Sequence, residues 1–140
     1  MWAIVHAISG MAVGHVLGAY GFVAIVFAAL ALHVLLDLVP HWDYTRTRNA
    51  WTWVVLDVAV SAVVLVVARV GFDADWKVIV AGVVSMAPDL DVLDSLHRSP
   101  RRVRFPSHWT RFPHGSCAPL PGVLIQMAVV VASAAILLLA

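Results

Sequence analysis

The stretch that decides the fold is GFVAIVFAALALHVLLDLVPHWD, residues 21–43. Its first 18 residues are apolar except for His33 and Asp37, and a helix needs ~20 such residues to cross a bilayer. Pro40 follows, and proline ends helices because it lacks the backbone N–H that the next turn requires. The stretch therefore predicts a membrane-spanning helix over residues 21–38 with an imidazole and a carboxylate near its carboxyl end.

The composition extends this prediction to the whole chain. The 140 residues are 62% hydrophobic and 12% charged, whereas soluble domains are ~45–50% apolar and ~25% charged. A chain of this length cannot bury so much apolar surface in a soluble core. These values exclude an ordinary soluble enzyme, a disordered chain and a basic nucleic-acid-binding domain. We therefore expect a single integral membrane domain with membrane lipids as partners and no nucleic acid.

Apolar segments on either side of this stretch predict four more helices. Together they give an all-α bundle of about five transmembrane helices in one domain, residues 1–140, with helices at about 2–19, 21–38, 51–70, 76–87 and 122–139. Residues 97–121 hold five Arg and five of the seven Pro. That segment is not expected to span the membrane, because charge and proline both oppose an apolar helix.

The distribution of cations predicts the orientation of the bundle. In a five-helix topology the amino terminus, residues 41–50 and residues 97–121 share one face. The Arg residues of this face are Arg46, Arg48, Arg98, Arg101, Arg102, Arg104 and Arg111. The opposite face carries Arg69 and Lys77. Loops rich in Lys and Arg stay in the cytoplasm, so we expect a multi-pass protein of a bacterial inner (plasma) membrane with the first face cytoplasmic.

Most His and Asp residues fall at that same face. His33 and Asp37 are four residues apart, so they share one side of a helix and can ligate one metal ion. The segments PHWD (residues 40–43) and PDLD (residues 88–91) share the form Pro-(His/Asp)-x-Asp. This similarity predicts two helical hairpins whose second helices end at one site. The predicted metal ligands are His6, His33, Asp37, His41, Asp89, Asp91 and His114.

The types of ligand indicate the metal and the reaction. Imidazole and carboxylate without thiolate suit Zn²⁺, Mn²⁺ or Fe²⁺, and the candidates suffice for two ions ~3.5–4 Å apart, as in many phosphoesterases. Asp43 and Asp57 are the predicted catalytic carboxylates, which would orient or deprotonate a water molecule. Arg102 and Arg104 are the predicted phosphate-binding residues. We therefore expect hydrolysis of a small-molecule or lipid phosphoester.

Two other functions are compatible with the same residues. One is a non-catalytic membrane protein in which a metal ion, or a polar network alone, stabilises the bundle. The other is a metal-ion carrier, which would need polar side chains at mid-membrane depth as well as at one face. A hydrolase needs an open coordination position at the metal, whereas a structural metal site is closed.

Two motifs resemble known membrane proteins. Residues 6–10 and residues 32–44, with the pattern His-x3-Asp-x2-Pro-His-x-Asp, resemble a group of small bacterial membrane proteins. Residues 87–91 and residues 108–116 resemble the membrane-bound metal-dependent hydrolase family, the YdjM-like inner-membrane proteins. The resemblance implies a metal-dependent hydrolase. A more distant similarity is to zinc-dependent phospholipase C and P1-type nucleases, all-helical enzymes that bind metals through His-x3-Asp or His-x3-Glu helices.

The chain departs from the family pattern at three points. The family usually has His after its Asp pair, and this chain has Val92. The later two His of the family are five residues apart, whereas His108 and His114 are six apart. Gly115 follows the second His instead of lying between the two. Because of these departures, His108 is not among the predicted ligands.

Overall fold

The structure, a computed structural model, describes residues 1–96 and 103–139. These residues form six α-helices and two short 3₁₀ helices: α1 (Ala3–Val16), α2 (Phe22–Leu38), η1 (Tyr44–Arg46), α3 (Ala50–Gly71), α4 (Trp76–Met86), α5 (Asp89–Leu96), η2 (Pro106–His108) and α6 (Pro119–Leu139). Within the described ranges the chain has no strand beyond an isolated bridge between His41 and Ser116. The prediction of an all-helical fold is therefore confirmed.

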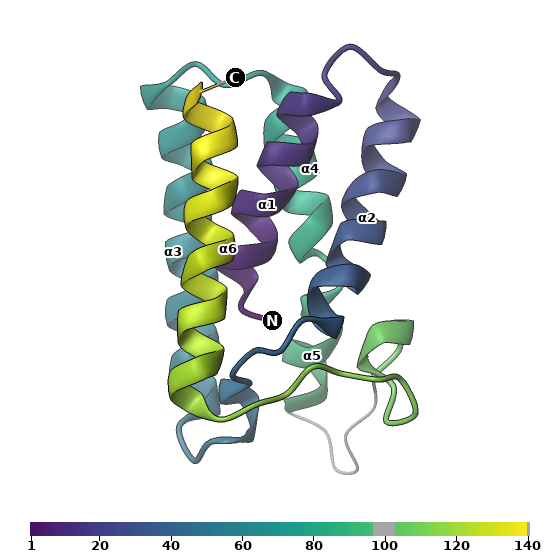
Figure 1. The fold of residues 1–140 in the computed structure, drawn as a ribbon, viewed down its shortest axis with the longest axis vertical. Coiled ribbons are helices and arrows are strands. Elements are labelled where there is room, and N and C mark those ends of the chain that lie inside the picture. Colours follow the sequence, from purple (N-terminus) through teal and green to yellow (C-terminus); the bar gives the residue numbers. More distant parts are fainter. Residues whose placement is uncertain (97–102, 140) are drawn as a thin grey trace.

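Helix α1 lies in the middle of the bundle, between α4 and α6 (Figure 1). Two glycines bring its backbone against α4. A Cβ at Gly10 would lie 2.5 Å from the carbonyl oxygen of Ala81, and one at Gly14 would lie 2.7 Å from the Ala81 Cβ. Real atoms do not approach so closely, so this packing requires residues without a side chain. The contact holds α1 at the centre, with His6 near one end of the bundle.

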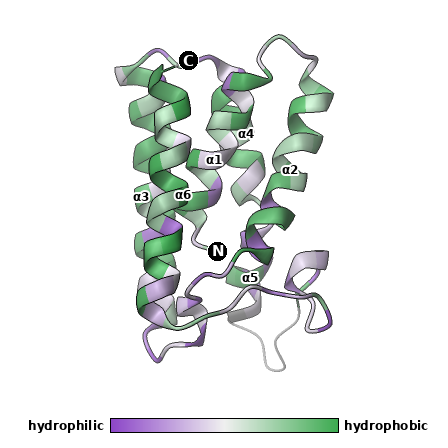
Figure 2. Cartoon of the chain, in the orientation of Figure 1, coloured by the Kyte–Doolittle hydropathy of each residue, from purple (hydrophilic) through white to green (hydrophobic). Residues whose placement is uncertain are grey.

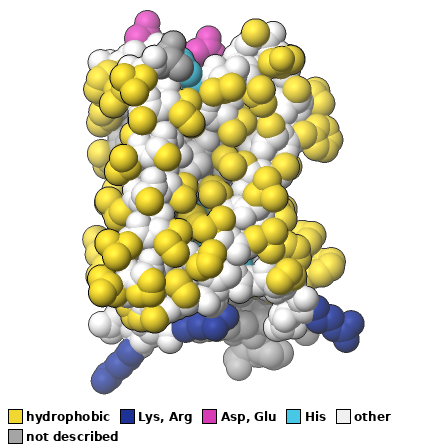
Figure 3. All heavy atoms as spheres, in the orientation of Figure 1, with side chains coloured by type: hydrophobic (Ala, Val, Ile, Leu, Met, Phe, Trp, Pro, Cys, Tyr) yellow, Lys and Arg dark blue, Asp and Glu magenta, His cyan; other side chains and the backbone are white. Residues whose placement is uncertain are grey.

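The outer faces of the bundle are apolar. Helices α3 and α6, with 22 and 21 residues, are long and apolar enough to cross a membrane, and α1 and α2 are shorter apolar helices. Exposed large hydrophobic side chains include Phe27 on α2, Val63 on α3 and Leu124 on α6. Figure 2 shows that the helices are hydrophobic along most of their length, and Figure 3 shows hydrophobic side chains over the visible side of the molecule with Lys and Arg at its lower end.

Three helices differ in their bounds from the prediction. Helix α1 ends at Val16, three residues before the predicted end. Helix α4 ends at Met86, and a separate helix, α5, begins after Pro88. Proline is tolerated at the start of a helix, where no N–H donor is needed, and the carboxylates in the first turn of α5 favour its positive end. Helix α6 starts at Pro119 for the same reason, inside the segment expected to be irregular.

The carboxyl ends of α2 and α4 lie at the same end of the bundle, the lower end in Figure 1. The amino end of α1 and helix α5 lie there too. The loop before α6 crosses this end and pairs with the chain after α2: His41 N–H donates to the Gly115 carbonyl (2.6 Å), and Cys117 N–H donates to the His41 carbonyl (2.9 Å). Segments far apart in the sequence therefore meet at one site.

Candidate metal centre

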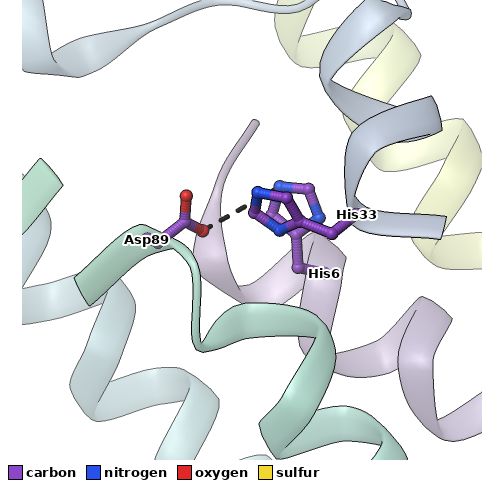
Figure 4. A group of neighbouring side chains, drawn as sticks. All are labelled: His6, His33 and Asp89. Carbon is purple, nitrogen blue, oxygen red and sulfur yellow. Dashed lines mark ion pairs between the residues drawn. The ribbon is translucent and has the colours of Figure 1, made fainter. Parts of the chain in front are cut away.

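Five ionisable side chains from four helices converge at the lower end of the bundle. They are His6 of α1, His33 and Asp37 of α2, Asp89 of α5 and His108 of η2. The rings of His6 and His33 stack with centroids 4.0 Å apart, and Figure 4 shows the Asp89 carboxylate facing them. The side chains of His6, His33 and Asp37 are fully buried.

The spacing of these groups matches that of ligands around one ion. His33 Nε2 lies 3.2 Å from Asp37 Oδ2, and His6 Nε2 lies 3.4 Å from Asp37 Oδ1. His108 Nε2 lies 3.5 Å from both Asp37 Oδ2 and Asp89 Oδ1. Charge-assisted hydrogen bonds are shorter, ~2.7–2.9 Å, whereas two ligands bonded at ~2.1 Å to a tetrahedral ion lie ~3.4 Å apart. The imidazole nitrogens and carboxylate oxygens are therefore spaced like the ligands of one metal ion.

Buried polar atoms without hydrogen-bond partners also indicate a metal-binding site. Neither ring nitrogen of His6 has a hydrogen-bond partner among the described residues, and Asp89 Oδ2 has none either. A buried polar group without a partner is costly, and most such groups in folded proteins are paired. A cation between the imidazoles and the carboxylates would satisfy both. The donor set therefore fits a divalent metal ion.

A second group adjoins the first and shares Asp37 with it. His41 Nε2 lies 3.1 Å from His114 Nε2, and both lie close enough to Asp37 to bind one ion with it. His41 Nδ1 donates to the Val39 carbonyl (2.8 Å), which directs the lone pair of Nε2 toward His114. Burial lowers the pKa of His41 to about 4 and also lowers the pKa of His114. Both imidazoles are then neutral at pH 7, as metal ligands must be.

The predicted ligands fall into three groups that could hold a metal ion. These groups are His6–His33–Asp89, His33–Asp37–His108 and Asp37–His41–His114. They contain six of the seven predicted ligands. Asp37 and His33 each belong to two groups, so neighbouring sites would share ligands.

Asp91, the remaining predicted ligand, lies behind the centre. Its Oδ1 accepts a hydrogen bond from His108 Nδ1 (2.6 Å), and its Oδ2 accepts from the N–H groups of Arg104 and Phe105 (2.7 and 2.6 Å). Burial alone would lower the pKa of His108, but hydrogen bonds to Asp37, Asp89 and Asp91 raise it to about 10. The surrounding carboxylates therefore favour the protonated, positively charged form of His108 when no metal is bound, and an ion that binds Nε2 would have to displace that proton.

His108 belongs to the centre although the sequence argument left it out. Pro106 starts the short helix η2, and the buried Ser107 donates to Asp37 Oδ2 (2.8 Å), which places His108 beside the same carboxylate. The six-residue spacing between His108 and His114 does not decide whether His108 reaches the centre. Helix η2 and the loop that carries His114 are held in place by separate contacts. The signal that could have identified His108 was its place in the same Pro- and Arg-rich segment as His114, a predicted ligand.

The two predicted catalytic carboxylates lie outside the three groups. Asp57 accepts hydrogen bonds from the N–H groups of Ala3 and Ile4 (2.7 and 3.0 Å) and from the Tyr44 hydroxyl (2.5 Å), so it anchors the start of α1. Asp43 accepts from the N–H of Thr45 (2.9 Å) at the start of η1. Asp43 also lines a cavity beside the centre, and Asp57 does not.

The structure describes one of the two predicted phosphate-binding residues, Arg104. Arg102 lies outside the described residues. Arg104 is exposed and lines a separate surface depression with Asp94 and Pro106. The cavity beside the centre has a volume of about 520 Å³ and reaches Asp89, His108 and His114. Among the described Lys and Arg side chains, Arg46 lines it.

Comparison with protein-family models, with curated proteins and with solved structures finds no match to this chain. The functional argument therefore rests on the geometry of the centre and its cavity.

Proposed function

We propose that this protein is a membrane-embedded, metal-dependent hydrolase that cleaves a phosphoester at the cytoplasmic face of a bacterial inner membrane. The observation that carries the proposal is the convergence of imidazole and carboxylate groups at ligand spacing beside a cavity, with both ring nitrogens of the buried His6 and one oxygen of Asp89 unpartnered among the described residues. A hydrolase needs an ion that its substrate can reach, and Asp89, His108 and His114 all line the cavity.

In the proposed topology α1, α2, α3, α4 and α6 cross the membrane. Helices α1 and α4, with 14 and 11 residues, are each shorter than a bilayer-spanning helix. Helix α1 packs against α2, α3, α4 and α6, and α5 continues the chain of α4 beyond Pro88. The described cations at the site end are Arg46, Arg48, Arg104 and Arg111. At the other end Arg69 pairs with Asp73, and Lys77 donates to the Gly18 carbonyl. This asymmetry supports a cytoplasmic site.

The proposed centre holds two ions of Zn²⁺, or of Mn²⁺ or Fe²⁺, since its ligands are imidazole and carboxylate. His6, His33, Asp89 and His108 would hold one ion, and His41 and His114 the other. Asp37, common to two groups, would lie between them. Such ions polarise phosphoryl oxygens and lower the pKa of water.

The reaction is an ordinary hydrolysis. The oxygen of a water molecule attacks phosphorus, the P–O bond to the alcohol breaks, and the alcohol leaves with a proton. Asp43 and Asp89 are the carboxylates among the described residues that line the cavity. Because Asp89 belongs to a metal group, we assign to Asp43 the role of taking the proton from water.

Metal content is the test of this proposal. We expect purified wild-type protein in detergent to carry one or two equivalents of a transition metal by mass spectrometry, and to release phosphate from a soluble ester such as p-nitrophenyl phosphate or its diester. His33→Ala with Asp37→Ala should lose both. His15→Ala, a change to an exposed histidine of α1, is the matched control and should lose neither. A wild type without metal after reconstitution with Zn²⁺ and Mn²⁺ would contradict the proposal.

The alternatives make different predictions in the same experiment. A structural metal would be retained without any hydrolysis. A carrier needs ligands at mid-membrane depth, where the buried polar groups include Ser9 and Ser133, which bond each other at 3.0 Å, and Ser61, which donates to the Asp57 carbonyl (2.7 Å). These hydroxyls are already satisfied, which favours the hydrolase over the carrier.

A further inference from the structure

The cavity beside the metal centre has one apolar wall. Val54 and Val58 lie one turn apart on α3, and Met86, Leu90 and Leu93 of the α4–α5 region line the cavity as well. The volume of about 520 Å³ is within the ~300–1,000 Å³ typical of ligand sites. A ligand that fills it must therefore be partly apolar.

The cavity lies at the level where a membrane ends. Trp51 and Trp53, on the first turn of α3 beside Val54, are 47% and 44% exposed. Trp109, which lines the cavity, is 53% exposed. Tryptophan rings gather at the boundary between hydrocarbon and headgroups. In the proposed topology the cavity therefore lies where a lipid carries its phosphate and its first methylene groups.

Arg46 supplies a cation in the same cavity. Its Nε lies 3.3 Å from Asp43 Oδ2, and its side chain is 68% exposed. The planar guanidinium group binds phosphate with two parallel hydrogen bonds. Arg46 is thus the described arginine that shares the cavity with the metal groups, a role that the sequence argument assigned to Arg102 and Arg104.

We propose that the cavity binds a membrane lipid phosphoester. The phosphate lies between the metal centre and Arg46, and the hydrocarbon chain begins along Val54 and Val58. This inference rests on the proposed hydrolase function and adds the substrate class. Hydrolysis would release the lipid alcohol with the proton from water and leave the phosphate at the metal centre.

Binding of alkylphosphonates tests the inference without turnover, since their carbon–phosphorus bond resists hydrolysis. Decylphosphonate and butylphosphonate are titrated calorimetrically into the full-length, Zn²⁺-loaded protein in detergent micelles. Each methylene that enters an apolar wall raises affinity ~4-fold, so decylphosphonate should bind at least ~10-fold more tightly than butylphosphonate.

Variants of α3 distinguish binding in the cavity from partitioning of the phosphonates into micelles. Val58→Phe fills the cavity and should remove the preference for decylphosphonate over butylphosphonate. The smaller change Val58→Ile should reduce this preference. Val60→Phe places the same ring on the outer surface, where Val60 is 51% exposed, and should keep the preference. Equal metal content in all three variants shows that the centre is intact.

Arginine variants test the phosphate contact. Arg46→Gln should lower the affinity for both phosphonates by a similar factor of ~10, which is the effect of losing a charge-assisted hydrogen bond. Arg48→Gln, at an exposed position outside the cavity, should leave both affinities within twofold of wild type.

The outcomes distinguish this inference from the proposed function. Equal affinity for the two phosphonates, or a preference that survives Val58→Phe, overturns the lipid inference. If the same protein still holds metal and hydrolyses a soluble ester, the hydrolase proposal stands. Absence of bound metal in the wild type overturns both.

Discussion

Asp91 accepts a hydrogen bond from His108 Nδ1 at 2.6 Å, while Nε2 of the same ring faces Asp37 and Asp89. One imidazole thus links a carboxylate behind the centre to two carboxylates in it. In metalloproteins such an outer carboxylate fixes the tautomer of the ligand and makes it a stronger base. In the proposed centre Asp91 would therefore position His108 rather than bind the ion.

Asp91→Asn should weaken metal binding ~10- to 100-fold, the usual effect of removing a carboxylate behind a histidine ligand. The number of ions bound at saturation should not change, because every ligand remains. Competition with a chelating dye measures the affinity. Asp73→Asn, at the other end of the bundle, is the control, and a variant Asp91→Asn that loses an ion outright would show that Asp91 is itself a ligand.

Gly115→Ala should disrupt the His41–His114 group. A Cβ at Gly115 would lie 2.3 Å from the Val39 carbonyl oxygen, so the loop must move and carry His114 with it. We expect the metal content to fall by one equivalent while the His6 group stays loaded. Gly21→Ala is the matched control, since a Cβ there meets nothing within 4 Å. An unchanged stoichiometry in Gly115→Ala would contradict the two-ion arrangement.

The parts of the site that the sequence predicts are those set by helical periodicity. His33 and Asp37 share one side of α2 because they are four residues apart, and Pro40 and Pro88 mark the ends of two helices at one face. Depth along a helix also placed His6 correctly at that face. These inferences needed only the rise and repeat of a helix.

The parts that the sequence does not predict depend on contacts between irregular segments. The positions of His108 and Asp91 relative to the centre depend on the chain before η2, which turns back onto α5, and no repeat in the sequence specifies that turn. Depth alone made Asp57 a candidate for catalysis. Its partners, the first N–H groups of α1, become visible only when the two helices are packed together.

Asp57→Asn should destabilise the bundle and leave the chemistry intact. The carboxylate accepts bonds from Ala3, Ile4 and Tyr44, and hydrogen bonds to charged groups contribute ~1.5–3 kcal/mol each. Thermal unfolding in detergent should therefore shift downward. Tyr44→Phe removes only one of these bonds and should therefore cost less than Asp57→Asn, ~1.5–3 kcal/mol. A variant Asp57→Asn with wild-type stability but no hydrolysis would restore the catalytic role.

Metal binding should stabilise the protein through His6. Both ring nitrogens of this fully buried residue lack partners among the described residues, so a bound ion relieves a cost that the bundle otherwise bears. At a free Zn²⁺ concentration 100 times the Kd, the free energy of unfolding should rise by ~2.7 kcal/mol per site.

The comparison of His6→Ala with His15→Ala isolates that effect, since both residues lie on α1 and only His6 belongs to the centre. Without metal, His6→Ala should lose only the stability that the packing of the buried ring contributes. No hydrogen bond is broken by the change, because neither ring nitrogen has a partner among the described residues. With Zn²⁺, its unfolding temperature should rise less than that of wild type, whereas His15→Ala should respond fully. If Zn²⁺ raised the unfolding temperature of both variants equally, His6 would not be a metal ligand.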